Sequence, residues 1–227
     1  MSSKGKLIVI DGIDGSGKGT QVQILSQRLL AEGIDFKVVD FPRYGHKSAG
    51  PVELYLNGLL GTKEEIGPKK GAVLYAVDRF CASVEIRNWL ESGSVILSNR
   101  YTAANLGHQG AKIRDSYERL RFWEWNLDFE HNFLGIPRPT KNFILSVNPE
   151  IAVRLIEQKA RRDYLGGKAK DIHEVDSEYL ELSWLSYMEL ARVYPNDFEV
   201  IVCDDGKDIF SQEVVADLIW AKIQPLI

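Results

Sequence analysis

Residues 7–20 read Leu-Ile-Val-Ile-Asp-Gly-Ile-Asp-Gly-Ser-Gly-Lys-Gly-Thr, an apolar run followed by a glycine-rich turn. A helical pattern with Val22, Leu25 and Leu29 comes next, so the chain has the order strand, turn, helix that a phosphate-binding loop requires. Glycines let successive N–H groups point at an anion, and the positive end of the next helix adds to the attraction. The sequence predicts that ATP phosphates bind the loop formed by Gly12, Ile13, Asp14, Gly15, Ser16, Gly17, Lys18, Gly19 and Thr20.

Lys18 is expected to place a compact positive charge on the outer phosphates. The strict form of the motif has Ser or Thr directly after the lysine, but this chain has Gly19 there. The hydroxyl that would contact Mg²⁺ is displaced to Thr20. Direct metal ligation by the loop therefore stays open at this point.

Length and charge exclude several classes of protein. A chain of 227 residues with a net charge of −4 fits one α/β domain and lacks the basic face typical of nucleic-acid binders. No apolar signal region or membrane-spanning run is present in the sequence. The two cysteines, Cys81 and Cys203, lie in apolar stretches and are expected in the core of a protein from a reducing compartment. We expect a cytoplasmic protein that binds neither nucleic acid nor membrane.

Alternating patterns indicate the fold. Apolar runs predict strands at 7–10, 36–41, 94–98, 142–147 and 198–202. Helical patterns lie at 17–32, 47–60, 68–92, 114–132, 149–160, 172–194 and 208–223. This alternation predicts one three-layer α/β domain over residues 1–227, with a five-stranded parallel sheet flanked by helices.

A basic segment at about residues 159–171 interrupts two of the helical patterns. Such a run is usually a solvated face. Beside a phosphate loop, its paired glycines favour a short mobile lid that brings cations to a transferring phosphate. The candidate cations are Arg161, Arg162, Lys168 and Lys170.

Polar residues follow the second and third strands, at the edge where parallel sheets bind ligands. Arg43 could hold a phosphate through two hydrogen bonds with Tyr44 assisting, although Pro42 also fits a plain turn with an exposed arginine. Asn99 stands where many phosphate-loop enzymes have an acid that orients metal-bound water. It can hydrogen-bond that water but brings no negative charge. Arg100 is a second candidate phosphate clamp.

A further set could contact a flat base. Tyr75 and Arg79 are one helical turn apart and share a face, although such pairs are often a core aromatic beside a surface charge. Asn105, His108 and Gln109 follow the third strand, and their donors and acceptors suit a base edge but equally well a turn. No cluster around the histidine predicts a metal site or a nucleophilic triad.

Four motifs in this order resemble the thymidylate kinases. They are G-I-D-G-S-G-K-G-T at 12–20, F-P-R-Y-G at 41–45, L-Y-A-V-D-R at 74–79 and N-R-Y-T-A-A-N-L-G-H-Q-G at 99–110. Many unrelated NTPases share the phosphate loop, whereas the other three motifs are far more specific. The resemblance covers essentially the whole chain. It implies a homodimeric kinase that uses ATP and Mg²⁺ to convert dTMP to dTDP.

The resemblance also implies roles for the residues around the acceptor phosphate. Lys18 and the loop amides would hold the ATP phosphates, and Asp14 would face the sugar and phosphate of dTMP. Arg43 and Arg100 would grip the acceptor phosphate with help from Tyr44. Because the attacking phosphate is largely dianionic at neutral pH, no general base is expected.

For the nucleoside, the resemblance implies that Tyr75 or Phe41 stacks on thymine. Arg79 would donate to a thymine carbonyl, and Asn105 would read the adjacent ring nitrogen. Many members have an aromatic residue near the position of His108 that crowds the sugar 2′ position.

Two features of the chain depart from the family pattern. Asn99 replaces the usual aspartate, and the lid has lysines where arginines are common. Because the loop has Ser16 where some members have arginine, the lid would supply the cations. Another nucleoside monophosphate kinase, a deoxynucleoside kinase and a nucleotide-dependent switch module are the alternatives.

Overall fold

The computed structural model describes residues 4–165 and 176–227. Within these ranges it describes every side chain except those of residues 63 and 159–165. Five parallel strands form one sheet in the order β2-β3-β1-β4-β5. All five predicted strands are confirmed, the last with the predicted bounds and the others with ends that differ by at most two residues. Their bounds are β1 (Lys6–Gly12), β2 (Phe36–Asp40), β3 (Val95–Asn99), β4 (Lys141–Ser146) and β5 (Phe198–Val202).

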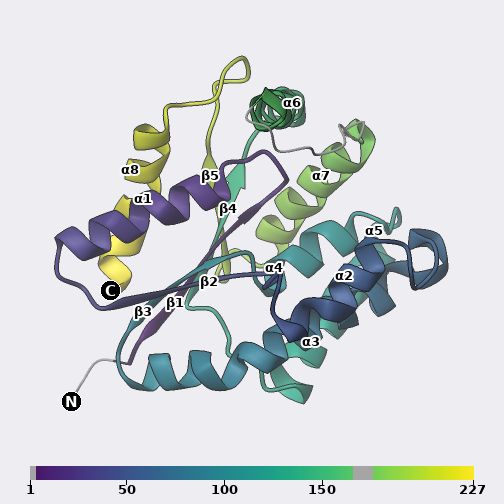
Figure 1. The fold of residues 1–227 in the computed structure, drawn as a ribbon, viewed down its shortest axis with the longest axis horizontal. Helices are drawn as coiled ribbons and strands as arrows, with labels where there is room; N and C mark the ends of the chain where they lie inside the picture. The colour runs from purple at the N-terminus through teal and green to yellow at the C-terminus, as the bar shows by residue number, and fades with distance from the viewer. Residues whose placement is uncertain (1–3, 166–175) are drawn as a thin grey trace.

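Helices cover both faces of the sheet, as predicted (Figure 1). The longer ones are α1 (Lys18–Ala31), α2 (Gly50–Leu56), α3 (Lys63–Glu91), α5 (Ser116–Leu127), α6 (Pro149–Leu165), α7 (Ser177–Val193) and α8 (Gln212–Ile223). Short turns complete the chain: η1 (Lys47–Ala49), α4 (Thr102–Ala104), η2 (Asn105–Gln109), η3 (Asp128–Phe133) and η4 (Gln224–Leu226). Helices α1 and α8 pack together on one face, and α3 and α7 contact the other.

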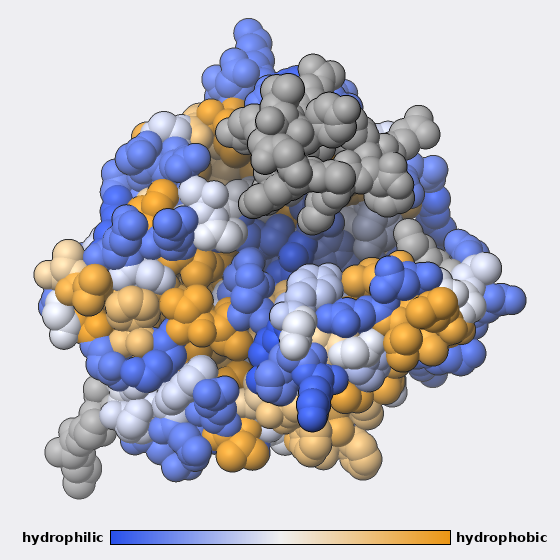
Figure 2. All heavy atoms as spheres, in the orientation of Figure 1, coloured by the Kyte–Doolittle hydropathy of each residue, from blue (hydrophilic) through white to orange (hydrophobic). Residues whose placement is uncertain are grey.

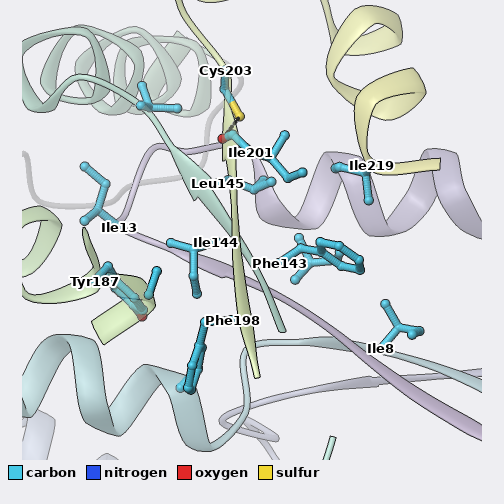
Figure 3. Packing of buried hydrophobic residues seen from close by; sticks show 14 of the residues in the cluster. Ile8, Ile13, Phe143, Ile144, Leu145, Tyr187, Phe198, Ile201, Cys203 and Ile219 are labelled. Carbon is cyan, nitrogen blue, oxygen red and sulfur yellow. Dashed lines mark hydrogen bonds between the residues drawn. The ribbon is translucent and has the colours of Figure 1, made fainter. Parts of the chain in front are cut away.

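The central strands β1, β3 and β4 are buried on both faces, so each alternates between two apolar layers, whereas the edge strands β2 and β5 are partly exposed. In β1, Leu7 and Val9 belong to a cluster with Ile86 of α3. Figure 3 shows the same alternation in β4: Ile144 lies on the side of Tyr187 from α7, and Phe143 lies on the other side, toward α1 and Ile219 of α8. The sheet is thereby fixed between the helices, and its carboxyl edge carries the loops described below.

Two predicted helices have different bounds for local reasons. The helix expected at 47–60 is a short turn followed by α2, which stops before Gly58 because that residue adopts φ 71°. The helix expected to open at Pro68 begins earlier, at a capping box made by Thr62 and Glu65. Gly67, at φ 67°, then breaks the helical geometry directly before the proline. Helix α3 is therefore kinked.

The other bounds differ at the helix ends. The predicted helix at 114–132 is α5 followed by a π-helical turn, and α8 begins only after its cap Ser211. Helix α6 continues to Leu165, past the expected end at 160 and into the predicted lid. The glycine pair and the rest of the lid from 166 onward lie outside the described residues, as does the start expected for the helix at 172.

The cysteine prediction is half wrong. Cys203 is buried, but Cys81 is exposed on α3 because it shares that helix's outer face with Phe80 and Val84. Within residues 4–165 and 176–227, no helix combines the length and apolar character needed to cross a membrane.

Candidate active site

The loop between β1 and α1 has the geometry of an anion cradle. Gly17 caps α1 at φ 83°, and Gly12 adopts φ 141°. A Cβ on Gly12 would lie 2.7 Å from the Leu145 carbonyl oxygen, so no side chain fits there. The N–H groups at the start of α1 therefore lie at the carboxyl edge of the central strand.

Lys18 is buried beneath this loop. Its Nζ donates to the Ile13 carbonyl oxygen at 2.7 Å and lies 3.4 Å from the Ser16 hydroxyl. Burial and the nearby Arg100 charge lower the pKa of Lys18 to about 7, against the attraction of Asp14. Bound phosphates would favour the charged form of this ammonium group, so anion binding and protonation of Lys18 support each other.

Asp11 forms the floor of the loop and was not singled out from the sequence. It is buried, and it accepts hydrogen bonds from the Tyr187 hydroxyl at 2.8 Å and the Gly12 N–H at 2.9 Å. Burial raises the pKa of Asp11, whereas Arg100 and Lys18 lower it in part. Helix α7 is thus tied through Tyr187 to the base of the phosphate loop.

Arg100 and Asp14 form an ion pair at the mouth of the loop. Arg100 adopts φ 61°, a left-handed conformation uncommon for a residue with a side chain. Burial raises the pKa of Asp14, but Arg100, His108 and Lys18 outweigh it and lower the pKa to about 2. The aspartate is therefore a carboxylate at neutral pH, and a positive clamp faces the loop from β3.

A cavity of about 630 Å³ opens beside this pair. In Figure 2, hydrophilic residues line a recess in the middle of the face shown, and hydrophobic residues gather toward its sides. Of the predicted substrate residues, the cavity wall contains Asp14, Phe41, Tyr44, Tyr75, Arg79, Arg100, Asn105, His108 and Gln109. The structure thus brings together residues from five different elements and loops.

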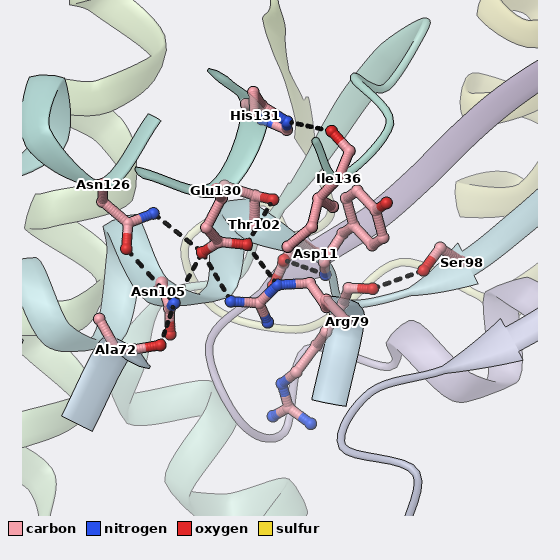
Figure 4. Close-up of polar contacts among 12 residues, drawn as sticks. Asp11, Ala72, Arg79, Ser98, Thr102, Asn105, Asn126, Glu130, His131 and Ile136 are labelled. Atoms are coloured by element: carbon pink, nitrogen blue, oxygen red, sulfur yellow. Dashed lines mark hydrogen bonds and ion pairs between the residues drawn. The ribbon is translucent and has the colours of Figure 1, made fainter. Parts of the chain in front are cut away.

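Arg79 reaches the cavity from within the core. Its Nε and Nη2 donate to the Glu130 carboxylate at 2.6 and 2.7 Å, and both side chains are almost completely buried (Figure 4). Glu130 also accepts from Asn105 at 2.8 Å, Asn126 at 3.0 Å and Thr102 at 3.0 Å. Burial raises the pKa of Glu130, but Arg79 outweighs it and the pKa lies below its ordinary value.

This network decides which atoms face the cavity. The Asn105 amide nitrogen is engaged by Glu130 and by the Ala72 carbonyl at 3.0 Å. Its side-chain oxygen and the third guanidinium nitrogen of Arg79 make no hydrogen bond with the described residues. The Asn105 oxygen and this third Arg79 nitrogen therefore offer the cavity one fixed hydrogen-bond acceptor and one fixed cationic donor from the same wall.

Arg43 is held away from that wall. Its guanidinium donates to the Asp78 carboxylate at 2.9 Å and to the Ser48 hydroxyl at 2.8 Å, and its backbone N–H donates to Asp78 at 2.7 Å. It does not line the cavity. In this arrangement, Arg43 fixes the turn after β2, whereas Phe41, Pro42 and Tyr44 of that turn line the cavity.

Aromatic side chains form the other side of the cavity. Phe41 is buried against Tyr101 with ring centroids 5.5 Å apart, whereas Tyr75 is half-buried and meets Tyr55 edge to face at 6.3 Å. Both Phe41 and Tyr75 line the cavity, so either face could receive a flat ring.

His108 lies between two tyrosines of α7. Its ring stacks on Tyr179 with centroids 5.9 Å apart, and its Nδ1 lies 3.2 Å from the Tyr179 hydroxyl. Burial lowers the pKa of His108 to about 3, so the imidazole is neutral. Its Nε2 is buried and has no hydrogen-bond partner among the described residues. Gln109 accepts from Lys112 at 2.8 Å through its side-chain oxygen.

The predicted metal residues lie at the start of α1 and the end of β3. A Cβ on Gly19 would be 3.8 Å from the Asn99 amide nitrogen, so the loop and Asn99 face each other. The Asn99 side-chain oxygen is buried without a partner in the described chain. Within that same part, no three His, Cys, Asp or Glu residues gather as metal ligands. A cation here would take most ligands from phosphate and water.

Sequence reasoning missed Asp11, Glu130 and Tyr187 because each acts through a partner far along the chain. Asp11 lies at the end of an apolar strand, where a polar residue is common and indicates only that the strand ends. One signal was available: an arginine on the inner face of a helix, such as Arg79 on α3, requires a buried countercharge.

A phosphate loop beside a second polar cavity, with a cationic clamp between them, defines a nucleoside monophosphate kinase of the phosphate-loop class. The family model for thymidylate kinase matches residues 10–213. The chain belongs to the thymidylate kinase family.

Individual relatives agree. The chain is 31% identical over 188 residues to thymidylate kinase from Mycobacterium tuberculosis, covering 82% of this chain and 85% of that one. It is 28% identical over 226 residues to thymidylate kinase from Bifidobacterium longum, covering 97% and 96%. The solved thymidylate kinase from Candida albicans superimposes with a TM-score of 0.70 at 20% identity, over 100% of this chain and 94% of that one, which shows the shared fold.

Proposed function

We propose that this thymidylate kinase transfers the terminal phosphoryl group of ATP to the phosphate of dTMP, giving ADP and dTDP, within a single domain. One observation carries the proposal: the phosphate loop and the 630 Å³ cavity share a boundary at Asp14 and Arg100. A nucleotide in each would bring two sets of phosphates together there.

The chemistry needs alignment and charge neutralisation more than proton transfer. The acceptor phosphate is itself the nucleophile and is largely dianionic at neutral pH. His108, the one histidine that lines the cavity among the described residues, has a pKa of about 3 and is a poor base for this step. Bringing two polyanions into line is the main barrier, and fixed cations lower it.

We assign the phosphate contacts accordingly. Lys18 and the loop amides bind the ATP phosphates, and Arg100 binds the acceptor phosphate by exchanging part of its contact with Asp14. Tyr44, exposed at the cavity rim, assists. Arg43 contributes through the turn it fixes and through the guanidinium nitrogen that makes no contact with Asp78 or Ser48.

The base contacts follow from the Glu130 network. The Arg79 guanidinium donates to a thymine carbonyl, and the Asn105 side-chain oxygen accepts from the adjacent ring N–H. Phe41 or Tyr75 stacks on the ring. Neutral His108, whose Nε2 has no hydrogen-bond partner in the described part of the chain, lies on the side of the sugar.

ATP and Mg²⁺ complete the proposed site. The orphaned Asn99 oxygen and the loop hydroxyls fit a hydrated cation, and Thr20 and Asn99 would hold it through water. Bound magnesium would neutralise phosphate charge as the phosphoryl group moves. The lid cations Arg161, Arg162, Lys168 and Lys170 stay proposals from the sequence, because their side chains lie outside the described part of the chain.

We further propose a cytoplasmic homodimer. The aromatic residues Phe122 and Trp123 of α5 offer no exposed face for this contact, because they are buried in the core. The outer face of α3 is a better candidate, since Val77, Phe80 and Val84 are exposed there one turn apart.

A coupled ADP-release assay with ATP and Mg²⁺ tests the function. The acceptors are dTMP, dUMP, UMP, CMP, AMP and thymidine. We expect strong preference for dTMP over every nucleotide except dUMP, which lacks only one methyl group. Activity on thymidine would indicate a deoxynucleoside kinase, and ATP binding without any phosphorylated product would indicate a switch module.

A further inference from the structure

The ends of β2 and β3 place an acid beside the phosphate loop. Asp40 and Asn99 are register partners in the parallel pair, so their side chains project to the same side of the sheet. The Asn99 amide faces Gly19 of the loop, at 3.8 Å from the position of a Cβ. Asp40, Asn99 and Gly19 therefore gather at one corner of the site.

That corner lacks both of the oxygen ligands that phosphate-loop enzymes commonly provide. Gly19 brings no hydroxyl directly after the lysine, and Asn99 brings a neutral amide at the end of β3. Magnesium prefers hard anionic oxygen, and it keeps several waters when few protein ligands are present. A carboxylate near this corner would supply the missing negative charge.

Three carboxylates raise the pKa of Lys18 by their charge, and two of them already have other bonding partners. Asp11 is buried under the loop and accepts hydrogen bonds from Tyr187 and Gly12. Asp14 is paired with Arg100. Asp40 forms no ion pair with any residue between 4 and 165 or between 176 and 227, and it is exposed to solvent. Partial desolvation raises the pKa of Asp40 above its ordinary value, and the Asn99 amide, Arg100 and Lys18 offset this rise only in part.

We propose that Asp40 supplies the carboxylate that holds the hydrated divalent cation of the bound nucleotide, in place of an acid at Asn99. The proposal rests on the proposed function, because the nucleotide phosphates provide the remaining ligands. Neighbouring strands are about 4.8 Å apart. A carboxylate one strand further from the loop therefore suits contact through a metal-bound water. Asn99 then acts as a positioning residue that orients Asp40 and the water.

The test measures metal binding directly. Free Mn²⁺ is followed by electron paramagnetic resonance during titration of the enzyme with saturating ADP. We expect Asp40→Asn to weaken Mn²⁺ binding about tenfold or more, the range typical of lost outer-shell partners. The double variant Asp40→Asn with Asn99→Asp returns the carboxylate to the neighbouring strand and should restore the affinity.

A matched control removes the same charge from the other end of the strand. Asp35 precedes β2 and bonds Ser94 and Lys37, so Asp35→Asn should leave Mn²⁺ binding unchanged. Unchanged Mn²⁺ affinity in Asp40→Asn would overturn the proposal and show that Asp40 only hydrogen-bonds Asn99. ADP binding is also measured in EDTA by calorimetry. If wild-type protein binds no ADP with or without metal, the proposed function fails as well, which separates the two outcomes.

Discussion

Arg100 is the residue at which backbone and charge constrain the site together. Its φ of 61° is unfavourable for any side chain but aims the guanidinium at Asp14 and the cavity. We expect Arg100→Ala to lower kcat about a hundredfold, the typical loss for one preorganised electrostatic donor. Steady-state assays with saturating ATP and dTMP measure it.

Arg100→Gly is the matched variant. It removes the same side chain but adopts positive φ without strain, so it should be about 1 kcal/mol more stable than the alanine variant with an equal loss of kcat. Near-normal turnover in both variants would exclude Arg100 from the phosphate clamp.

Glu130 stabilises the base-facing wall through charge. Glu130→Gln leaves the buried Arg79 cation without its partner, and removing one member of such a pair costs about 3–5 kcal/mol. Because the folded pKa of Glu130 lies below its ordinary value, its contribution is complete above pH 4.5 and is lost as pH falls through the folded pKa. Urea unfolding should therefore show a large difference in the free energy of unfolding between the wild type and Glu130→Gln at pH 7, and a smaller difference at acidic pH.

The catalytic readout distinguishes a positioning role from stability alone. Where the variant is folded, KM for dTMP should rise while KM for ATP changes little, because Arg79 and Asn105 lose their fixed orientation. Equal effects on both substrates would contradict the role of Glu130 in the acceptor pocket.

At the scale of elements, the kink in α3 shapes the cavity. Gly67 and Pro68 line it, and Gly67 holds φ 67° with nothing near a Cβ, so Gly67→Ala changes only backbone preference. Gly58→Ala, at φ 71°, likewise changes only the backbone preference, but Gly58 lies outside the cavity. Each substitution should cost about 1–2 kcal/mol of stability. Only Gly67→Ala should raise KM for dTMP, and equal kinetics for the two variants would show that the kink does not shape the acceptor pocket.

The elements also show what a sequence can predict. Strands and long helices follow from local sequence patterns, because the central strands are apolar runs buried on both faces and the long helices repeat apolar residues along one face. The kink and the capping box of Thr62 precede Pro68, which by itself looks like a helix start. Residue pairs such as Arg79 and Glu130 are separated by 51 positions, so no local pattern encodes their contact. Contiguous motifs predicted candidate residues that line the cavity, whereas residues whose partner is set by tertiary packing, such as Glu130, were missed.

At the scale of the whole molecule, the exposed apolar face of α3 bears on assembly. Phe80→Asp places a charge in the middle of that face and should convert the proposed homodimer to monomer in sedimentation velocity. Leu30→Asp is the control, since Leu30 is 71% exposed on α1, a helix on the opposite face of the sheet. A dimer retained in Phe80→Asp would place the interface elsewhere. A monomeric wild-type protein would contradict the proposed homodimer.

The register pairing of β2 with β3 has an evolutionary consequence. Two positions that are distant in the sequence, 40 and 99, occupy neighbouring places at one sheet edge. Selection for a single carboxylate at that edge would act on the pair and not on either position alone. Among homologous chains, an acid at one position should then coincide with a neutral or basic residue at the other, so that the two vary as a linked pair.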